Sequence, residues 1–373
     1  MDDSVSQDNW LFSRSMSRRQ LILNGLAAGL SLPAIGLLLE ACGSSTPAAS
    51  SGGTVGGTLE LYSSTDTAQQ VADAFGKSTG VKVKNYNDDA GVVLARIEAE
   101  ASHPKADVYL LSDAEGMAGL GQQGRLQAYL SAQRSGMSDL ALKVSDSAGL
   151  FTAIGLSGAG PFIYNNKALS TSTAPVDWPD LLKPQFKDQI AMTDPAFSGP
   201  SYGAIFGILQ RMGDVPGWQF LTSLFHNGLK VYKTNTPTLA AVESGGRQIA
   251  LAQDSAAFYD AVAKGAPLGV NYPTSGVVLQ GDVIGIEAKS SNVATAKAFI
   301  DYVLSQQGQT AEIGDAATGK GVSGDAWIIP IRPGVTQDPQ RVSSGINWTI
   351  VDLNKAAQQE ASIKQRFKTL ASS

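Results

Sequence analysis

Cysteine and histidine are almost missing from this chain of 373 residues, which contains one cysteine and two histidines. One cysteine cannot form an internal disulfide or a cysteine-rich zinc site, and two histidines leave little for a histidine-based catalytic or metal centre. Charged residues make up only 16% of the chain and the formal net charge is −5, so we expect no basic surface for nucleic acid. We therefore expect neither an enzyme nor a protein with a cofactor or a nucleic-acid partner.

The N-terminal 41 residues read as an export signal. Arg18 and Arg19 directly precede an apolar stretch over 21–39, an order typical of twin-arginine signal peptides. The following Leu-Glu-Ala-Cys resembles a bacterial lipobox, although its glutamate stands where a small residue is usual, and predicts cleavage before a lipidated Cys42. The alternative is an uncleaved membrane anchor, since 19 residues can just span a bilayer. Both place the body outside the cytoplasm, behind a flexible Ser/Gly/Ala tether over 42–57.

Strands and helices alternate from Thr58 onward. Serines and threonines at the first strand's end are good helix N-caps, and Gly80 is a helix stop. This βαβα order favours an α/β fold with a mostly parallel sheet flanked by helices. We expect strands over 58–62, 81–86 and 106–111. Apolar residues recur at helical spacing from Ala68 to Phe75, which predicts a helix that stops at Gly80, and we expect further helices over 92–101 and 114–120.

Two apolar runs favour a division into two lobes joined by a hinge. The run over 151–165 is interrupted by glycines and would cross from the first lobe to the second, and the alternating run over 276–286 would return. We expect helices over 293–304 and 353–370. The boundaries that we predict are 58–156 for the first part of lobe 1, 157–275 for lobe 2, and 276–373 for the return to lobe 1 with the C-terminal helices.

Two segments resemble a dinucleotide-binding motif and a nucleophile elbow, but neither predicts an enzyme. The G-x-G-x-x-G over 119–124 follows a predicted helix, whereas a dinucleotide site needs it between a strand and a helix. The sequence around Ser157 departs from the G-x-S-x-G nucleophile elbow, and its histidine could only be His103 or His226. A secreted hydrolase stays open as an alternative that a histidine close to Ser157 or Ser201 would favour.

Three clusters of small hydroxyl residues stand at predicted strand-to-helix turns, over 63–65, 198–202 and 234–238. A helix N-terminus offers unpaired N–H groups and about half a positive charge, which suits phosphate, phosphonate or carboxylate. Each cluster alone is explained by helix capping. Together they would lie in both lobes at the carboxyl ends of strands, where open α/β sheets bind ligands.

The chain from Thr58 to Gly334 resembles the bacterial extracellular solute-binding proteins of ABC importers, in the group that binds iron(III), phosphonates or sugar phosphates. The segments that carry this resemblance, by their order and spacing, are 59–65 (LELYSST), 106–113 (ADVYLLSD), 155–165, 178–182 (WPDLL), 190–203, 272–277 (YPTSGV) and 329–334 (IPIRPG). The resemblance implies the two-lobed type II periplasmic-binding-protein fold. It also implies a monomer that closes on a ligand and delivers it to a permease with its ATPase.

Iron is the first alternative ligand. Ferric members have two adjacent tyrosines where our alignment puts Ala256 and Ala257, which offer no oxygen ligand for Fe³⁺, so Tyr259 and Tyr272 would be the metal candidates. Members without that tyrosine pair resemble binders of phosphonates, sugar phosphates and other small solutes. We predict a ligand site with an anionic head held by hydroxyls from both lobes, Gln253 and Asp254 reading an amine or hydroxyl, and Tyr272 covering it. The full predicted set is Ser63, Ser64, Thr65, Ser112, Ser157, Ser198, Gly199, Ser201, Tyr202, Gln253, Asp254 and Tyr272.

Overall fold

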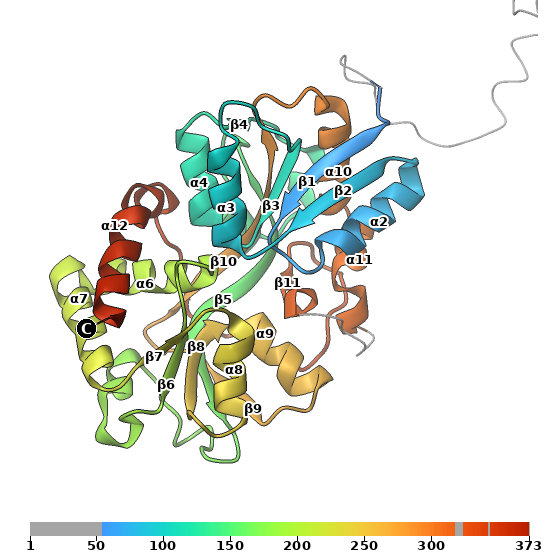
Figure 1. The fold of residues 1–373 in the computed structure, drawn as a ribbon. Coiled ribbons are helices and arrows are strands. Elements are labelled where there is room, and N and C mark those ends of the chain that lie inside the picture. Colours follow the sequence, from blue (N-terminus) through green and yellow to red (C-terminus); the bar gives the residue numbers. More distant parts are fainter. Residues whose placement is uncertain (1–53, 318–323, 342–343, 373) are drawn as a thin grey trace, which may run out of the picture. The chain divides into compact units, whose positions relative to one another are not determined.

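Two long strands, β5 (Thr152–Asn165) and β10 (Val277–Glu287), run antiparallel through the middle of the body and connect its two lobes (Figure 1). In this computed structural model the described residues are 54–317, 324–341 and 344–372. They form one sheet in the order β2-β1-β3-β10-β5-β8-β6-β7, with short strands added at β5 and β10. The export signal, Cys42 and most of the tether lie outside the described residues.

Lobe 1 is a sheet covered by helices on both faces, in which β1, β2 and β3 are parallel, as the βαβα order predicted, and β10 runs antiparallel to β3. Strand β1 pairs in parallel with β2 and β3, and β3 pairs with the second half of β10. Its core joins Leu59 and Leu61 of β1 to Phe75 and Phe299 from two helices. The elements are β1 (Thr58–Ser63), α2 (Ala68–Thr79), β2 (Lys82–Asn87), α3 (Ala90–Ala99), β3 (Val108–Leu111), α4 (Ala114–Gln122), β4 (Leu126–Gln127), η2 (Ala132–Gly136), α5 (Asp139–Lys143), α10 (Val293–Leu304), α11 (Gln306–Ala317), η6 (Gly324–Trp327) and β11 (Ile329–Pro330).

Lobe 2 repeats the pattern with its own core. Strand β6 pairs in parallel with β7 and β8, and Phe162, Trp178 and Tyr202 are buried among the helices. The elements are η3 (Trp178–Leu182), η4 (Pro184–Phe186), β6 (Ile190–Thr193), α6 (Gly199–Met212), α7 (Asp214–His226), β7 (Lys230–Tyr232), α8 (Asn235–Glu243), β8 (Ile249–Gln253), α9 (Asp254–Phe258), the π-helix η5 (Tyr259–Ala263) and β9 (Leu268–Asn271). Short β12 (Trp348–Thr349) pairs with the start of β10.

The crossing from lobe 1 to lobe 2 occurs within β5. Its first half pairs with β10 and its second half with β8 and β9. The register shifts between Ala159 and Phe162, where Gly160 has a φ of 73° that favours glycine. The C-terminal helix α12 (Leu353–Ala371) packs against α4 of lobe 1 and α6 and α7 of lobe 2, so it contacts both lobes.

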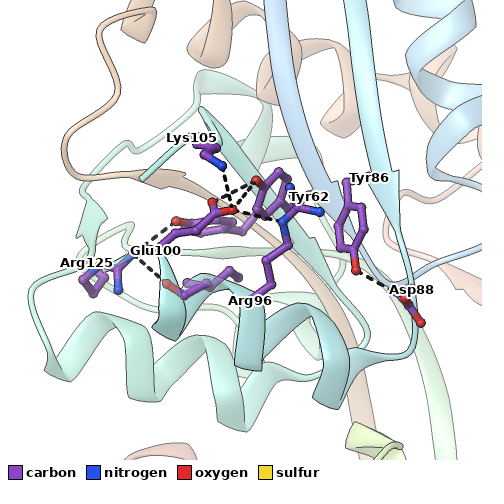
Figure 2. Close-up of polar contacts among 9 residues, drawn as sticks. Tyr62, Tyr86, Asp88, Arg96, Glu100, Lys105 and Arg125 are labelled. Atoms are coloured by element: carbon purple, nitrogen blue, oxygen red, sulfur yellow. Dashed lines mark hydrogen bonds and ion pairs between the residues drawn. The ribbon is translucent and has the colours of Figure 1, made fainter. Parts of the chain in front are cut away.

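A cluster of charged and aromatic residues fixes α3 to the sheet of lobe 1 (Figure 2). Arg96 on α3 lies over the ring of Tyr86, with its guanidinium carbon 4.0 Å from the ring centroid, and pairs with Glu100 at 3.1 Å. Tyr62 of β1 donates its hydroxyl hydrogen bond to Glu100, and burial is the first cause that raises the Tyr62 pKa to about 12. This network holds the carboxyl end of β1 and the last turn of α3 in fixed relation.

Most of the expected elements are confirmed. The helix predicted over 293–304 has those bounds, and the helix expected to stop at Gly80 is α2, which Gly80 ends in the left-handed conformation. The G-x-G-x-x-G motif lies in the last turns of α4, and Gly124 follows with a φ of 70°. The described residues contain no helix that is long and apolar enough to cross a membrane.

Candidate functional site

A cleft of about 310 Å³ lies where loops from the two lobes meet. Lobe 1 contributes the segments that follow β1, β2 and β3, and lobe 2 contributes those that follow β6, β7 and β8. All six segments follow the carboxyl ends of parallel strands, the usual ligand position in α/β sheets. The lining residues from lobe 1 are Ser64, Asp66, Asp89, Ala90, Ser112 and Gly324, and those from lobe 2 are Phe197, Ser198, Gly199, Pro200, Thr234, Asn235, Thr236, Leu239, Gln253, Ala256, Tyr259, Asp260 and Lys264.

Three helices of at least eight residues begin at this cleft: α3, α6 and α8. The Ser198 hydroxyl caps α6 by accepting a hydrogen bond from the Ser201 N–H. Thr234 is the N-cap residue of α8, but its side chain makes no capping hydrogen bond to the helix. Its hydroxyl can therefore bind a ligand without giving up a capping bond. The cleft is therefore bordered by the positive ends of helices from both lobes.

The two walls of the cleft touch each other. Lys233 of lobe 2 forms an ion pair with Asp89 of lobe 1 at 3.2 Å, and the Gly91 N–H donates to the Phe197 carbonyl oxygen at 3.4 Å. A Cβ atom built on Gly91 would come within 2.1 Å of the Ala196 carbonyl oxygen. The lobes thus approach closely beside α3, and the approach needs glycine at position 91.

The cleft carries both signs of charge. Its carboxylates are Asp66, Asp89 and Asp260, and its ammonium group belongs to Lys264. Lys264 pairs with Asp260 at 2.5 Å and also lies 4.5 Å from the centroid of the Tyr259 ring. Burial, reinforced by the charge of Asp89, raises the Asp66 pKa.

Five members of the predicted set line the cleft: Ser64, Ser112, Ser198, Gly199 and Gln253. Two more stand directly behind this lining. Ser157, in the middle of β5, accepts a hydrogen bond of 3.1 Å from the Gln253 amide and so orients that amide. Thr65 is buried beside Ser64, and its hydroxyl has no hydrogen-bond partner among the described residues.

Three other predicted residues, Ser63, Ser201 and Tyr202, make contacts within the fold and do not line the cleft. The Ser63 hydroxyl bonds to the side chains of Asn85 and Asn87 of β2. Ser201 is buried in the first turn of α6, and the Tyr202 hydroxyl donates to the Ala356 carbonyl of α12. Ser63 is turned toward β2, and in the first turn of α6 the side chains of Ser201 and Tyr202 face the core.

Asp254 and Tyr272 also lie behind the cleft lining, in a buried network that includes Arg341. The Arg341 guanidinium contacts the Asp254 carboxylate at 3.0 Å, and Tyr272 donates to the same carboxylate at 2.8 Å. Burial is the largest cause that raises the Tyr272 pKa. The Asp254 charge is therefore compensated by Arg341, which the sequence analysis did not foresee because 87 residues separate the two.

Several lining residues were missed by the sequence analysis. Asp66 and Asp89 follow strands in lobe 1, where caps and acidic residues are common, so nothing set them apart. Asn235 and Thr236 belong to a hydroxyl cluster that was recognised but not included in the predicted set. Lys264 gave no signal, since it follows a π-helix that periodicity did not reveal.

The arrangement is poor for the two alternatives. Ala256 and Ala257 lie on α9, Tyr259 lines the cleft, and the Tyr272 hydroxyl is held by Asp254. Within the described ranges, no three His, Cys, Asp or Glu side chains are grouped to hold a metal ion. For a hydrolase, Ser157 bonds to Gln253, and His226 lies at the end of α7, away from any strand-to-helix turn.

Comparisons with known proteins agree with this architecture. A family model described as bacterial extracellular solute-binding protein matches residues 103–313. The putative 2-aminoethylphosphonate-binding periplasmic protein of Salmonella typhimurium is 27% identical over 278 residues, 71% of this chain and 74% of that protein. The major ferric iron-binding protein of Neisseria meningitidis is 25% identical over 255 residues, 66% and 75% of the two chains. The solved periplasmic binding protein AfuA of Actinobacillus pleuropneumoniae, with fructose-6-phosphate bound, has a TM-score of 0.73 at 22% identity, over 85% of this chain and 99% of that one.

These matches confirm the predicted resemblance and the predicted fold. The family model spans more than half of the chain, and the neighbouring structures are two-lobed type II periplasmic binding proteins. The relatives are transport proteins that bind small ligands outside the cytoplasm, so the body of this protein is extracytoplasmic as well. The chain belongs to the family of bacterial extracellular solute-binding proteins that serve ABC importers.

Proposed function

We propose that this protein is the lipid-anchored binding component of an ABC importer, and that it captures a small phosphonate or organophosphate between its lobes. The observation that carries the proposal is the convergence of α3, α6 and α8 on one polar cleft. Helix N-termini from two lobes, with serine and threonine hydroxyls, can hold a tetrahedral anion from several sides. The protein catalyses nothing and acts as a monomer.

The anionic group binds chiefly to lobe 2. There the start of α8 supplies Asn235 and Thr236, and Lys264 supplies an ammonium group beside Tyr259. Lys264 also forms an ion pair with Asp260, so its charge is only partly available to an anionic ligand. The acidic residues of the cleft make an entirely anionic ligand unfavourable, which favours a zwitterion.

Delivery follows from closure. A ligand that contacts both lobes binds the closed arrangement better than the open one and shifts the population toward it. The contacts of Asp89 with Lys233 and of Gly91 with Phe197 belong to this closed arrangement. A lipid on Cys42 and the tether over 42–57 keep the closed protein near its permease and ATPase.

A thermal-shift screen tests the proposal. The purified protein is heated with inorganic phosphate, 2-aminoethylphosphonate, glucose 6-phosphate or ferric citrate, and saturation at about 100 times Kd adds about 2.7 kcal/mol to the free energy of unfolding. We expect a shift with a phosphonate or phosphate ester, and a smaller one in the Lys264→Met variant. Lys187→Met, at an exposed position outside the cleft lining, is the matched control. A shift with ferric citrate alone would replace our proposal with an iron carrier.

A further inference from the structure

A buried carboxyl group without a cationic partner lies next to the lining of the cleft. Asp282 of β10 is 1% exposed, and within the described residues its carboxyl group has no cationic partner and only the Ser112 hydroxyl as a polar neighbour. Burying a polar group without a hydrogen bond costs free energy, and a buried charge costs more. A buried carboxyl group without a counter-charge calls for an explanation, and a positively charged group of a bound ligand is one.

Asp282 faces the cleft through Ser112. Strand β10 pairs with β3 so that Val283 is opposite Leu111, which places Asp282 opposite Ser112 at the end of β3. Ser112 lines the cleft, and its buried hydroxyl has no partner among the described residues other than the Asp282 carboxyl group. On the other side, Asp282 is opposite Gly155 of β5, which has no side chain to offer. The carboxyl group and the hydroxyl therefore form one polar corner that opens toward the cleft.

The other acidic groups near the ligand already have partners. Asp89 pairs with Lys233, Asp260 with Lys264, and Asp254 with Arg341. Asp66 also interacts with another group. Asp282 differs from Asp89, Asp260 and Asp254 because no cation of the described residues compensates it, so a cation brought by the ligand would be its counter-charge.

We propose that Asp282 and Ser112 form the subsite for a primary ammonium group of the ligand, whose anionic end lies at the helix N-termini. This inference rests on the proposed function and deepens it, because it makes the ligand an amino-phosphonate or amino-phosphate. The ammonium donates one hydrogen bond to the Asp282 carboxylate and one to the Ser112 hydroxyl. Asp282 is a specificity-determining residue in this assignment. It plays no part in closure.

The test compares two ligands that differ only in the amine. Isothermal titration of the purified full-length protein with 2-aminoethylphosphonate and with ethylphosphonate should show at least a tenfold preference for the amine. In Asp282→Asn, which keeps the shape and removes the charge, affinity for 2-aminoethylphosphonate should fall at least tenfold and affinity for ethylphosphonate less than threefold. Asp260→Asn, a cleft carboxylate that already has Lys264, should change both affinities by the same factor.

A second measurement separates this role from a structural one. Without ligand, Asp282→Asn should melt at the same temperature as the unmodified protein or higher, because the substitution removes an uncompensated buried charge. A lower melting temperature with an unchanged amine preference would overturn the inference, and so would equal binding of the two phosphonates by the unmodified protein. If no phosphonate or phosphate ester binds at all, the proposed function falls together with the subsite.

Discussion

At the scale of single residues, the ion pair between Asp254 and Arg341 behind the cleft is almost completely buried, with both side chains at most 1% exposed. Arg341→Met should lower the free energy of unfolding by about 3–5 kcal/mol, because it leaves a buried charge without compensation. Urea denaturation measures the change. Lys183→Met, which breaks an exposed pair with Asp180, should cost at most about 1 kcal/mol. A loss below about 1 kcal/mol for Arg341→Met would show that Asp254 is solvated or neutral.

Two neighbouring carboxyl groups beside α12 make stability depend on pH. Burial, with help from Glu360, raises the Asp113 pKa to about 7, and burial, with help from Asp113, raises the Glu115 pKa to about 8. Lys364 of α12 opposes the shift at Asp113, and the Gln280 amide opposes the one at Glu115. An acid with a raised pKa stabilises the fold below its unfolded pKa, and this contribution is lost as the pH rises through the folded pKa. Stability should therefore fall between about pH 4 and pH 8.

Glu115→Gln should remove part of this dependence. One pKa unit corresponds to about 1.4 kcal/mol, so the variant should be more stable than the unmodified protein by at least about 1 kcal/mol at pH 9 and nearly equal at pH 4. Chemical denaturation across this pH range measures the difference. A difference that is the same at both pH values would mean that Glu115 does not titrate in the folded protein.

At the scale of elements, α3 lies so close to the segment before α6 that a side chain at position 91 would clash, and we propose that closure of the lobes needs this close approach. Gly91→Ala should weaken ligand binding at least tenfold, since the new Cβ would lie within 2.1 Å of a backbone oxygen of lobe 2. The free energy of unfolding should change little, by no more than the helix preference of alanine over glycine, which is about 1 kcal/mol. Titration calorimetry gives the affinity. Gly119→Ala, where the nearest atom would be 3.7 Å away, is the matched control; unchanged binding in Gly91→Ala would mean that the lobes need not touch here.

The elements could be predicted from the sequence better than the site. Periodicity found α2 and α10 and the two crossing strands because each buries one consistent face or stays apolar throughout. The site depends on which side of a turn faces the ligand, and hydroxyl clusters do not show that. Tyr202 and Ser198 are four residues apart on one helix, yet one packs against α12 and the other lines the cleft. Long-range partners such as Arg341 for Asp254 leave no local pattern at all.

At the scale of the whole molecule, the proposed function requires the protein to stay near its permease, and we propose that a lipid on Cys42 keeps it there. If Cys42 carries the lipid, Cys42→Ala should move the protein from the membrane fraction to the soluble extracytoplasmic fraction while the affinity of the body for its ligand stays the same. Immunoblots of fractionated cells measure the distribution, and metabolic labelling with a palmitate analogue should mark the unmodified protein but not the variant. Ser44→Ala, two residues further along the tether, is the control. A variant that stays in the membrane fraction with its first 41 residues intact would instead support the uncleaved anchor, since 19 apolar residues can hold a protein there without a lipid.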